Sequence, residues 1–113
     1  MSKINARQEF TIEITGKTVI AAVIHHEEAY IIKCTAILFP RYTSDEYETF
    51  FNSLNFDYDS GYGGQELFGV IWYADSTWSE RYEYDGKECW IHREYPNVVE
   101  IINYYKNIEG KTK

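Results

Sequence analysis

Cysteine and proline are scarce in this chain of 113 residues, which has only two of each. Cys34 and Cys89 lack the spacing of redox or metal-binding pairs, so we interpret both as small buried apolar residues. No run approaches the roughly 18 apolar residues of a membrane span, and the polar first ten residues do not resemble a signal peptide. The sequence therefore predicts a cytoplasmic protein that makes no membrane contact.

Motifs that hold phosphates or activate nucleophiles are also missing. Gly61, Gly63 and Gly64 are followed by Gln65 and Glu66, without the Lys-Ser or Lys-Thr pair that a phosphate site needs. The chain has no nucleophile elbow and no dinucleotide fingerprint. We therefore predict no enzymatic activity, no catalytic residue, no metal and no cofactor.

Positive charge is absent between Arg41 and Arg81, a stretch that holds eight of the 18 Asp and Glu residues. Because the chain has only 11 Lys and Arg, its net charge is −7, which argues against direct binding of nucleic acid. One interpretation is a solvated acidic face that maintains solubility. The other is an acidic surface that docks on a basic groove of a partner protein.

The composition predicts one sheet-rich domain over residues 1–113. Apolar residues make up 44% of the chain and charged residues 26%, as in folded domains, and aromatics reach 18%, which favours strands. Residues 9–15 alternate strictly and predict a strand that a Gly16-Lys17 turn joins to the next strand. Residues 30–39 predict a covered strand, and residues 25–28 the loop before it.

Two segments have the spacing of helices. Residues 44–54 carry apolar side chains at helical intervals, and Thr43 and Glu46 have the spacing of a capping box. Asn97 predicts the start of a second helix that ends near Gly110. We expect its apolar stripe to be buried: Val98, Ile101, Ile102, Tyr105 and Ile108.

Residues 67–95 predict a three-stranded meander. A type I′ turn at Asp85-Gly86 sets Arg81 opposite Trp90, and a three-residue loop sets Trp72 opposite Trp78. This register creates one apolar face, which we expect to line the core: Phe68, Val70, Trp72, Trp78, Tyr82, Cys89 and Ile91. The order βββα-βββα predicts an α+β fold, a mostly antiparallel sheet of about six strands with two helices packed on it.

A few polar residues are candidates for chemistry. Glu80 falls on the predicted apolar face, so it needs a partner, and Arg93 is the expected one. The segment His25-His26-Glu27-Glu28, together with the distant His92, has side chains that could bind a metal ion. Adjacent histidines on an extended chain point to opposite faces, however, so His25 and His26 would not readily share one ion. The segment Asp57–Gly64 begins like the calcium-binding loop of a helix-loop-helix site. Such a loop requires glycine at its sixth position and glutamate at its twelfth, but Tyr62 and Phe68 occupy these positions. We interpret it as a connecting or binding loop.

Residues 68–90 contain the pattern W-x-E-R-x-E-Y-D-G-x-E-x-W, formed by Trp78, Glu80, Arg81, Glu83, Tyr84, Asp85, Gly86, Glu88 and Trp90. The segment resembles a Trp-rich hairpin of small accessory proteins of tailed bacteriophages. It departs from that pattern at Ser76, where glycine is usual, and at Cys89, where a second Trp is common. The resemblance implies an origin on a phage or other mobile element, and a small acidic protein that inhibits host defence enzymes in the host cell cytoplasm.

Together these features predict a non-enzymatic protein that binds and inhibits a host nucleic-acid-handling or defence protein with a basic surface. Carboxylates would replace phosphates as partners of Arg and Lys, and tyrosines would anchor the contact. The predicted partner-binding residues are Asp45, Glu46, Glu48, Asp57, Tyr58, Asp59, Tyr62 and Glu66.

Two other classes of function are alternatives. One is a small-molecule or nucleotide-binding protein that stacks its ligand on Trp72, Trp78 and Trp90. The other is a hydrolase that uses His92, Glu80 or a metal ion. The sequence also leaves open a homodimer through an exposed sheet edge.

Overall fold

The structure is a computed structural model that describes residues 3–59 and 64–112. It confirms the predicted α+β class and the mostly antiparallel sheet. The elements in chain order are β1 (Lys3–Asn5), α1 (Ala6–Glu13), β2 (Val19–Glu28), β3 (Ile31–Leu38), α2 (Ser44–Ser53), β4 (Asp57–Asp59), β5 (Leu67–Tyr73), β6 (Trp78–Tyr84), β7 (Lys87–Arg93) and α3 (Val98–Thr112).

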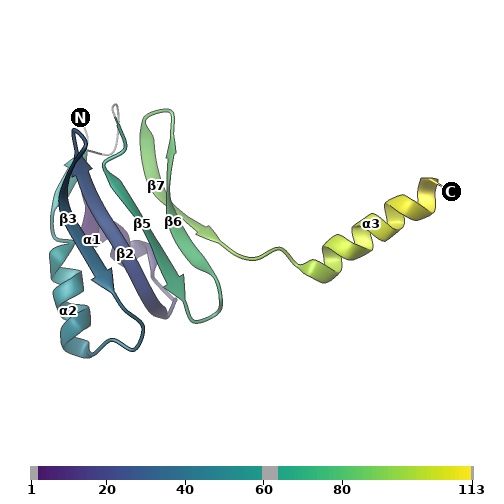
Figure 1. Cartoon of the computed structure of the whole chain (residues 1–113), viewed down its shortest axis with the longest axis horizontal. Helices are drawn as coiled ribbons and strands as arrows, with labels where there is room; N and C mark the ends of the chain where they lie inside the picture. The colour runs from purple at the N-terminus through teal and green to yellow at the C-terminus, as the bar shows by residue number, and fades with distance from the viewer. Residues whose placement is uncertain (1–2, 60–63, 113) are drawn as a thin grey trace.

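The main sheet has five strands in the order β3-β2-β5-β6-β7, and all neighbours are antiparallel (Figure 1). Strands β1 and β4 pair separately as a two-stranded sheet. Helix α1 lies behind the main sheet in the view of Figure 1, and α2 lies beside β3. We call the face toward α1 and α2 the inner face and the opposite face the outer face.

Residues 9–15 do not form the predicted strand, because most of them belong to helix α1. The Asn5 side chain accepts a hydrogen bond from the Gln8 backbone N–H at 3.0 Å and starts the helix. Phe10 is fully buried and its ring lies 5.5 Å from that of Phe50. Ile12, which the alternating pattern placed on the same face as Phe10, is 72% exposed. The N-cap signal and the contact of Phe10 therefore override the two-residue periodicity.

The hairpin turns lie partly where the sequence predicts. The predicted loop at residues 25–28 is part of β2, and the chain turns instead at Ala29 and Tyr30, whose φ angles are 51° and 68°. Asp85 and Gly86 have φ angles of 53° and 81°, which confirms the predicted turn. The pairings of Arg81 with Trp90 and of Trp72 with Trp78 are also confirmed.

The predicted register is correct, but the sheet is oriented the other way relative to the core. The expected core face, which includes Trp72 and Trp78, is the outer face. The inner face instead buries Leu67, Ile71, Tyr73, Ser79, Glu88 and Trp90. Its polar groups are tolerated because α1 supplies their partners, as when the Ser79 hydroxyl donates to Glu13 Oε2 at 2.6 Å.

Helices α2 and α3 both begin as predicted but differ in packing. The capping box of α2 is present, since the Glu46 N–H donates to Thr43 Oγ1 and the Thr43 N–H donates to Glu46 Oε1. Asn97 caps α3 in the same manner, with its side chain accepting from the Glu100 N–H at 3.1 Å. Yet α3 does not pack on the sheet as expected, and it extends away from the rest of the chain (Figure 1).

The overall dimensions reflect this projecting helix. The structure measures 59 × 37 × 22 Å and its radius of gyration is 18.1 Å. A compact chain of this length would have a radius of gyration of about 13 Å. The larger radius of gyration is explained by α3, which projects from the rest of the chain. In this position no surface formed by the described residues covers the apolar side chains of α3.

Candidate functional site

The outer face of the main sheet is apolar and has no helix over it among the described residues. Trp72 is 41% exposed and Tyr82 39% exposed, although both lie within strands of the five-stranded sheet. Ile20 and Ile37 are exposed on the same face. Contiguous exposed apolar surface of this kind marks an interaction site in proteins that are otherwise well packed.

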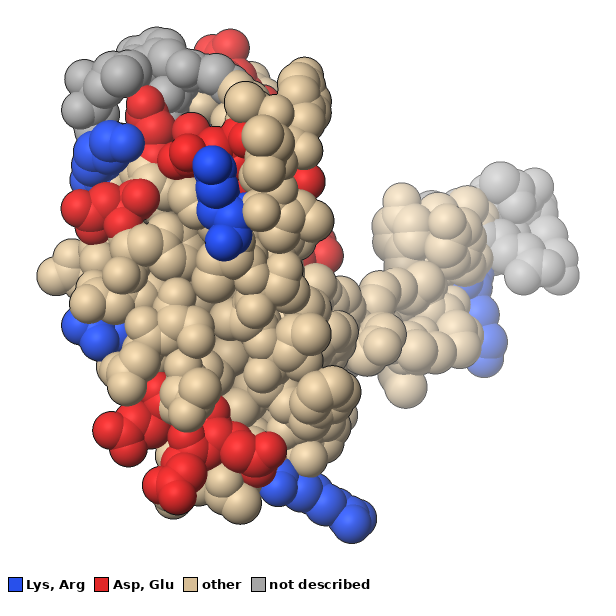
Figure 2. Space-filling view, turned by 60° about the vertical axis from the view of Figure 1, so that its left-hand side comes forward, with Lys and Arg blue, Asp and Glu red and all other residues tan. Residues whose placement is uncertain are grey.

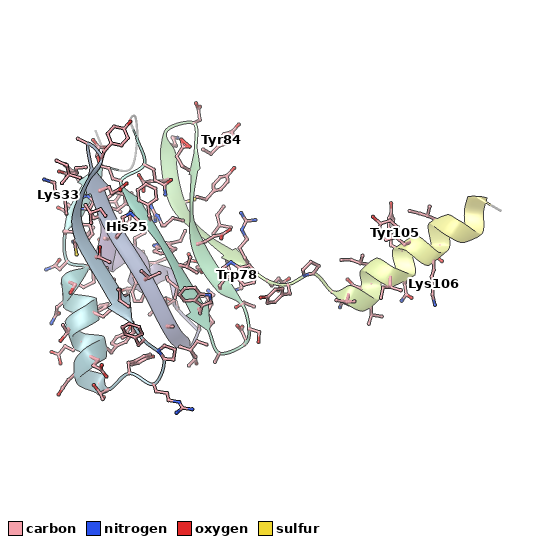
Figure 3. All side chains as sticks on the ribbon, viewed as in Figure 1. His25, Lys33, Trp78, Tyr84, Tyr105 and Lys106 are labelled. Atoms are coloured by element: carbon pink, nitrogen blue, oxygen red, sulfur yellow. The ribbon has the colours of Figure 1, made fainter. Side chains whose placement is uncertain are left out.

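A hollow of about 530 Å³ lies on this outer face, near the end of β7. The apolar part of its lining consists mainly of Ile20, Val70, Trp72, Trp78 and Tyr95. The rings of Trp78 and Tyr95 are 5.0 Å apart and tilted by 59°. Figure 3 shows Trp78 at the side of the sheet from which the chain continues to α3. The hollow is therefore built by the sheet together with the first residues of the segment that leads to α3.

Glu80 and Arg93 form the predicted pair at the border of this hollow, with Arg93 Nε donating to Glu80 Oε1 at 2.8 Å. Both side chains are more than one third exposed, so Glu80 is not the buried carboxylate that the sequence suggested. An exposed pair of this kind contributes little to stability. Its effect is to hold the last residues of β7 against β6 where the chain turns toward α3.

Helix α3 is the second uncovered apolar surface. Every side chain described in α3 is exposed, and the exposed fractions of its apolar residues range from 40% at Ile108 to 66% at Val99. Figure 3 shows Tyr105 and Lys106 on different sides of the helix, as its amphipathic pattern requires. A free helix of 15 residues is only marginally stable in water. Contact with an apolar surface would stabilise α3 and cover its apolar stripe.

The inner face carries a buried charge network centred on Arg81. Its side chain is 1% exposed, and Arg81 Nη2 donates to Glu88 Oε1 at 2.9 Å and to the Tyr58 hydroxyl at 2.8 Å. Glu9 Oε1 lies 3.1 Å from Arg81 Nη1, and the guanidinium lies over the Trp90 ring at 5.1 Å. This last contact is a cation–π pair across the predicted pairing of Arg81 with Trp90.

Burial and partners shift the pKa values within this network. Burial alone would lower the pKa of Arg81, but Glu9, Tyr58 and Glu88 outweigh it and raise the pKa above its ordinary value. The pKa of Tyr58 is raised far above its ordinary value by burial and by its hydrogen bond to Glu9. Arg81 therefore stays charged and Tyr58 stays neutral. Because the side chains of Arg81, Tyr58 and Glu88 are buried, we assign the network a structural role.

The predicted partner-binding residues do not form one surface. Asp45, Glu46 and Glu48 are exposed on the first turns of α2, whereas Tyr58 is fully buried and offers no contact surface. Figure 2 shows acidic side chains gathered toward both ends of the visible face, with mostly uncharged residues between them. Asp57 accepts a hydrogen bond from Asn5, and Glu66 lies beside His26. Tyr62 lies outside the described residues.

The residues of the two alternative functions are also separated. Trp90 is buried under Arg81 and cannot stack on a ligand, while Trp72 and Trp78 line the outer hollow. His92 contacts Thr77 at 2.8 Å from the inner side of β7, and Glu80 projects from the outer face. These positions bring no histidine and carboxylate of the predicted hydrolase set together.

Sequence reasoning recognised much of the outer apolar set but assigned it to the core. It did not single out Ile20 or Tyr95 as surface residues. The signal that could have corrected this is Asn5 followed by Gln8, a capping pattern that predicts a helix over the next residues. A helix there supplies carboxylates for the face that carries Arg81, and so identifies that face as the inner one.

Comparison with protein-family models, with curated proteins and with solved structures gave no match. Among the described residues, no helix combines the length and the apolar character needed to cross a bilayer.

Proposed function

We propose that this chain is a non-catalytic binding protein and that its outer sheet face binds helix α3 of a second copy of the chain. The observation that carries this proposal is that one chain leaves uncovered both an aromatic sheet face and an apolar helix. Reciprocal exchange of α3 between two copies would cover both surfaces twice. Such an arrangement is a closed twofold dimer, the commonest form of protein oligomer.

The dimensions of the two surfaces support this arrangement. Helix α3 has 15 residues and is therefore about 22 Å long. Strands β5, β6 and β7 have seven residues each and span about 23 Å. The helix can thus lie along the strands and place its aliphatic stripe on Val70, Trp72 and Tyr82.

The path of the chain favours exchange over folding back. The Glu80–Arg93 pair and the Trp78–Tyr95 contact hold the connecting segment against the outer face as far as Tyr95. Pro96 follows, and proline restricts the preceding residue to an extended conformation. From there α3 leads away from its own sheet (Figure 1). A helix that points away from its own sheet is positioned to reach the sheet of another molecule.

Sedimentation velocity of the full chain over a range of concentrations tests the dimer. We expect association of the native chain, and loss of it in Trp72→Asp on the face and in Ile102→Asp on the helix. The matched control is Asn103→Asp, which puts the same charge on the neighbouring position of α3 but outside the apolar stripe, and should associate normally.

Mixing the two defective variants distinguishes exchange from other modes of association. Ile102→Asp retains an intact outer face and Trp72→Asp retains an intact α3. A mixed dimer can therefore form one of its two face–helix contacts, the one between the outer face of Ile102→Asp and the helix of Trp72→Asp. We expect dimers in the mixture that neither variant forms alone. A native chain that stays monomeric at every concentration, or a mixture that stays monomeric, would contradict the proposal.

The expected inhibition of a host nucleic-acid-handling or defence protein is a second proposal, supported by the exposure of Asp45, Glu46 and Glu48 on α2. Affinity capture from a bacterial lysate with a double variant, Asp45→Lys and Glu48→Lys, tests it. Glu46 is left intact because it belongs to the capping box. Glu94→Lys is the control for charge reversal elsewhere. Equal capture by the native chain and the double variant at physiological salt would rule out this surface.

A further inference from the structure

Three ligand-type side chains meet where the start of β5 pairs with β2. His26 and Glu28 lie two residues apart on β2, and Glu66 directly precedes β5. His26 Nε2 is 3.4 Å from Glu66 Oε1 and 3.7 Å from Glu28 Oε1, and the ligand atoms of all three residues lie within 4.8 Å of one another. Two-residue spacing on a strand puts His26 and Glu28 on one face, which is the face that Glu66 reaches.

The surrounding structure holds these side chains in place. The His26 ring is buried and stacks on Phe56 with centroids 4.7 Å apart. The Glu66 carbonyl accepts from the Glu27 N–H at 2.8 Å, and the Glu66 N–H donates to the buried Glu88 carboxylate at 2.9 Å. Glu28 is half-exposed, so the cluster opens to solvent on that side. Fixed donors with one open side are the features of a site that an ion can enter.

A buried carboxylate oxygen that lacks a partner among the described residues adjoins the cluster. The Asp59 N–H faces Glu66 Oε1 at 3.4 Å, and Asp59 Oδ1 is buried without a hydrogen-bond partner in the described part of the chain. Within that same part, no Lys or Arg pairs with Glu28, Glu66 or Asp59. A buried carboxylate oxygen without a partner costs free energy that a bound cation would offset. This deficit is an observation separate from the spacing of the three ligands.

We infer that His26 Nε2 and one carboxylate oxygen each of Glu28 and Glu66 bind a divalent transition-metal ion of the zinc class. Tetrahedral zinc with bonds of about 2.0 to 2.1 Å separates its ligand atoms by roughly 3.4 Å, close to the two distances from His26. An imidazole among the ligands favours zinc over magnesium and calcium, which prefer oxygen alone. Three protein ligands leave a fourth position for water. This inference does not depend on α3 exchange.

Calorimetric titration of the metal-free full chain with Zn²⁺ tests the site. We expect one ion per chain, and affinity at least about tenfold weaker in His26→Asn and in Glu66→Gln. The matched controls are His25→Asn and Glu27→Gln, because these residues form the equivalent pair, 3.8 Å apart, on the opposite face of the same strand. Both controls should bind Zn²⁺ like the native chain, and Mg²⁺ should produce no binding heat.

Glu28→Gln keeps the test decisive if His26→Asn fails to fold, since Glu28 is exposed and its loss leaves the buried part intact. Co²⁺ should give a visible absorption band with the native chain that weakens or shifts in Glu28→Gln. Absence of stoichiometric Zn²⁺ binding would overturn the inference. Equal losses in His25→Asn and His26→Asn, or a Co²⁺ spectrum unchanged by Glu28→Gln, would overturn it as well.

Discussion

The two faces of the main sheet carry similar side chains in different surroundings. Each face has a tryptophan and an Arg–Glu pair that joins β6 to β7: Arg81, Glu88 and Trp90 on the inner face, and Arg93, Glu80 and Trp78 on the outer face. On the inner face these groups are buried and supported by α1. On the outer face they border an open hollow. Similar residues thus build a structural network on one side and a binding surface on the other.

The largest expected contrast concerns the two arginines. Arg81→Ala leaves Glu88 and Glu9 without their buried cation, and we expect it to lower the free energy of unfolding by about 3 to 5 kcal/mol. Arg93→Ala removes one member of an exposed pair and should cost at most about 1 kcal/mol. Urea unfolding followed by circular dichroism measures both. Similar losses in the two variants would show that the inner network is not the stabilising one.

Two isoleucines extend the contrast to apolar packing. Ile71 is fully buried on the inner face, so Ile71→Ala should cost about 2 to 5 kcal/mol through lost burial and a new cavity. Ile37 is more than half exposed on the outer side of β3, and Ile37→Ala should cost about 0.5 kcal/mol. Unfolding is measured at low concentration, where self-association does not contribute. An equal cost at Ile37 would indicate that its own chain already covers the outer face.

Tyr58 makes the inner face sensitive to alkaline pH. Because its pKa is raised in the folded state, the folded chain retains a proton that the unfolded chain loses above about pH 10. The stabilising contribution is therefore complete below that pH and is lost progressively as the pH rises above it. We expect Tyr58→Phe to be less stable at neutral pH but to have a shallower decline above pH 10. Parallel pH profiles of the native chain and Tyr58→Phe would contradict this role.

The helix caps give the smallest expected effects. Thr43→Ala breaks the capping box of α2, which covers the inner face, and should cost about 1 kcal/mol. Asn97→Ala removes the equivalent contact in α3, which covers nothing in its own chain. We expect Asn97→Ala to lower helicity and self-association without changing the urea midpoint of the sheet, measured at low concentration where self-association does not contribute. A shift of that midpoint would mean that α3 packs on its own sheet.

Local sequence signals predicted the pairing of β5 with β6 and of β6 with β7, but not the position of the core. The Asp85-Gly86 turn and the capping box at Thr43 depend on neighbouring residues, and the structure confirms both. The choice between two half-apolar faces depends on α1, whose residues alternate like a strand. The alternating pattern predicts a strand there, so the sequence does not reveal that a helix brings Glu9 to Arg81.

The candidate site was predictable only in part. The aromatic residues of the outer face were identified, but their exposure follows from the position of α3, which no local signal specifies. The sequence argues against a metal site within His25-His26-Glu27-Glu28 because adjacent histidines on a strand point to opposite faces, and the structure confirms that they do. It does not predict a site that combines His26 and Glu28 with Glu66. Glu66 lies 40 residues from His26 in the sequence, and only strand pairing brings the two together.

Hydrogen exchange of the α3 backbone amides at two protein concentrations tests the central claim most directly. If the outer face of a second copy covers α3, these amides will be protected at high concentration and will exchange rapidly after dilution, while the inner strands stay protected throughout. Equal protection of α3 at both concentrations would show that the helix covers its own sheet. Rapid exchange at both would show that nothing covers it.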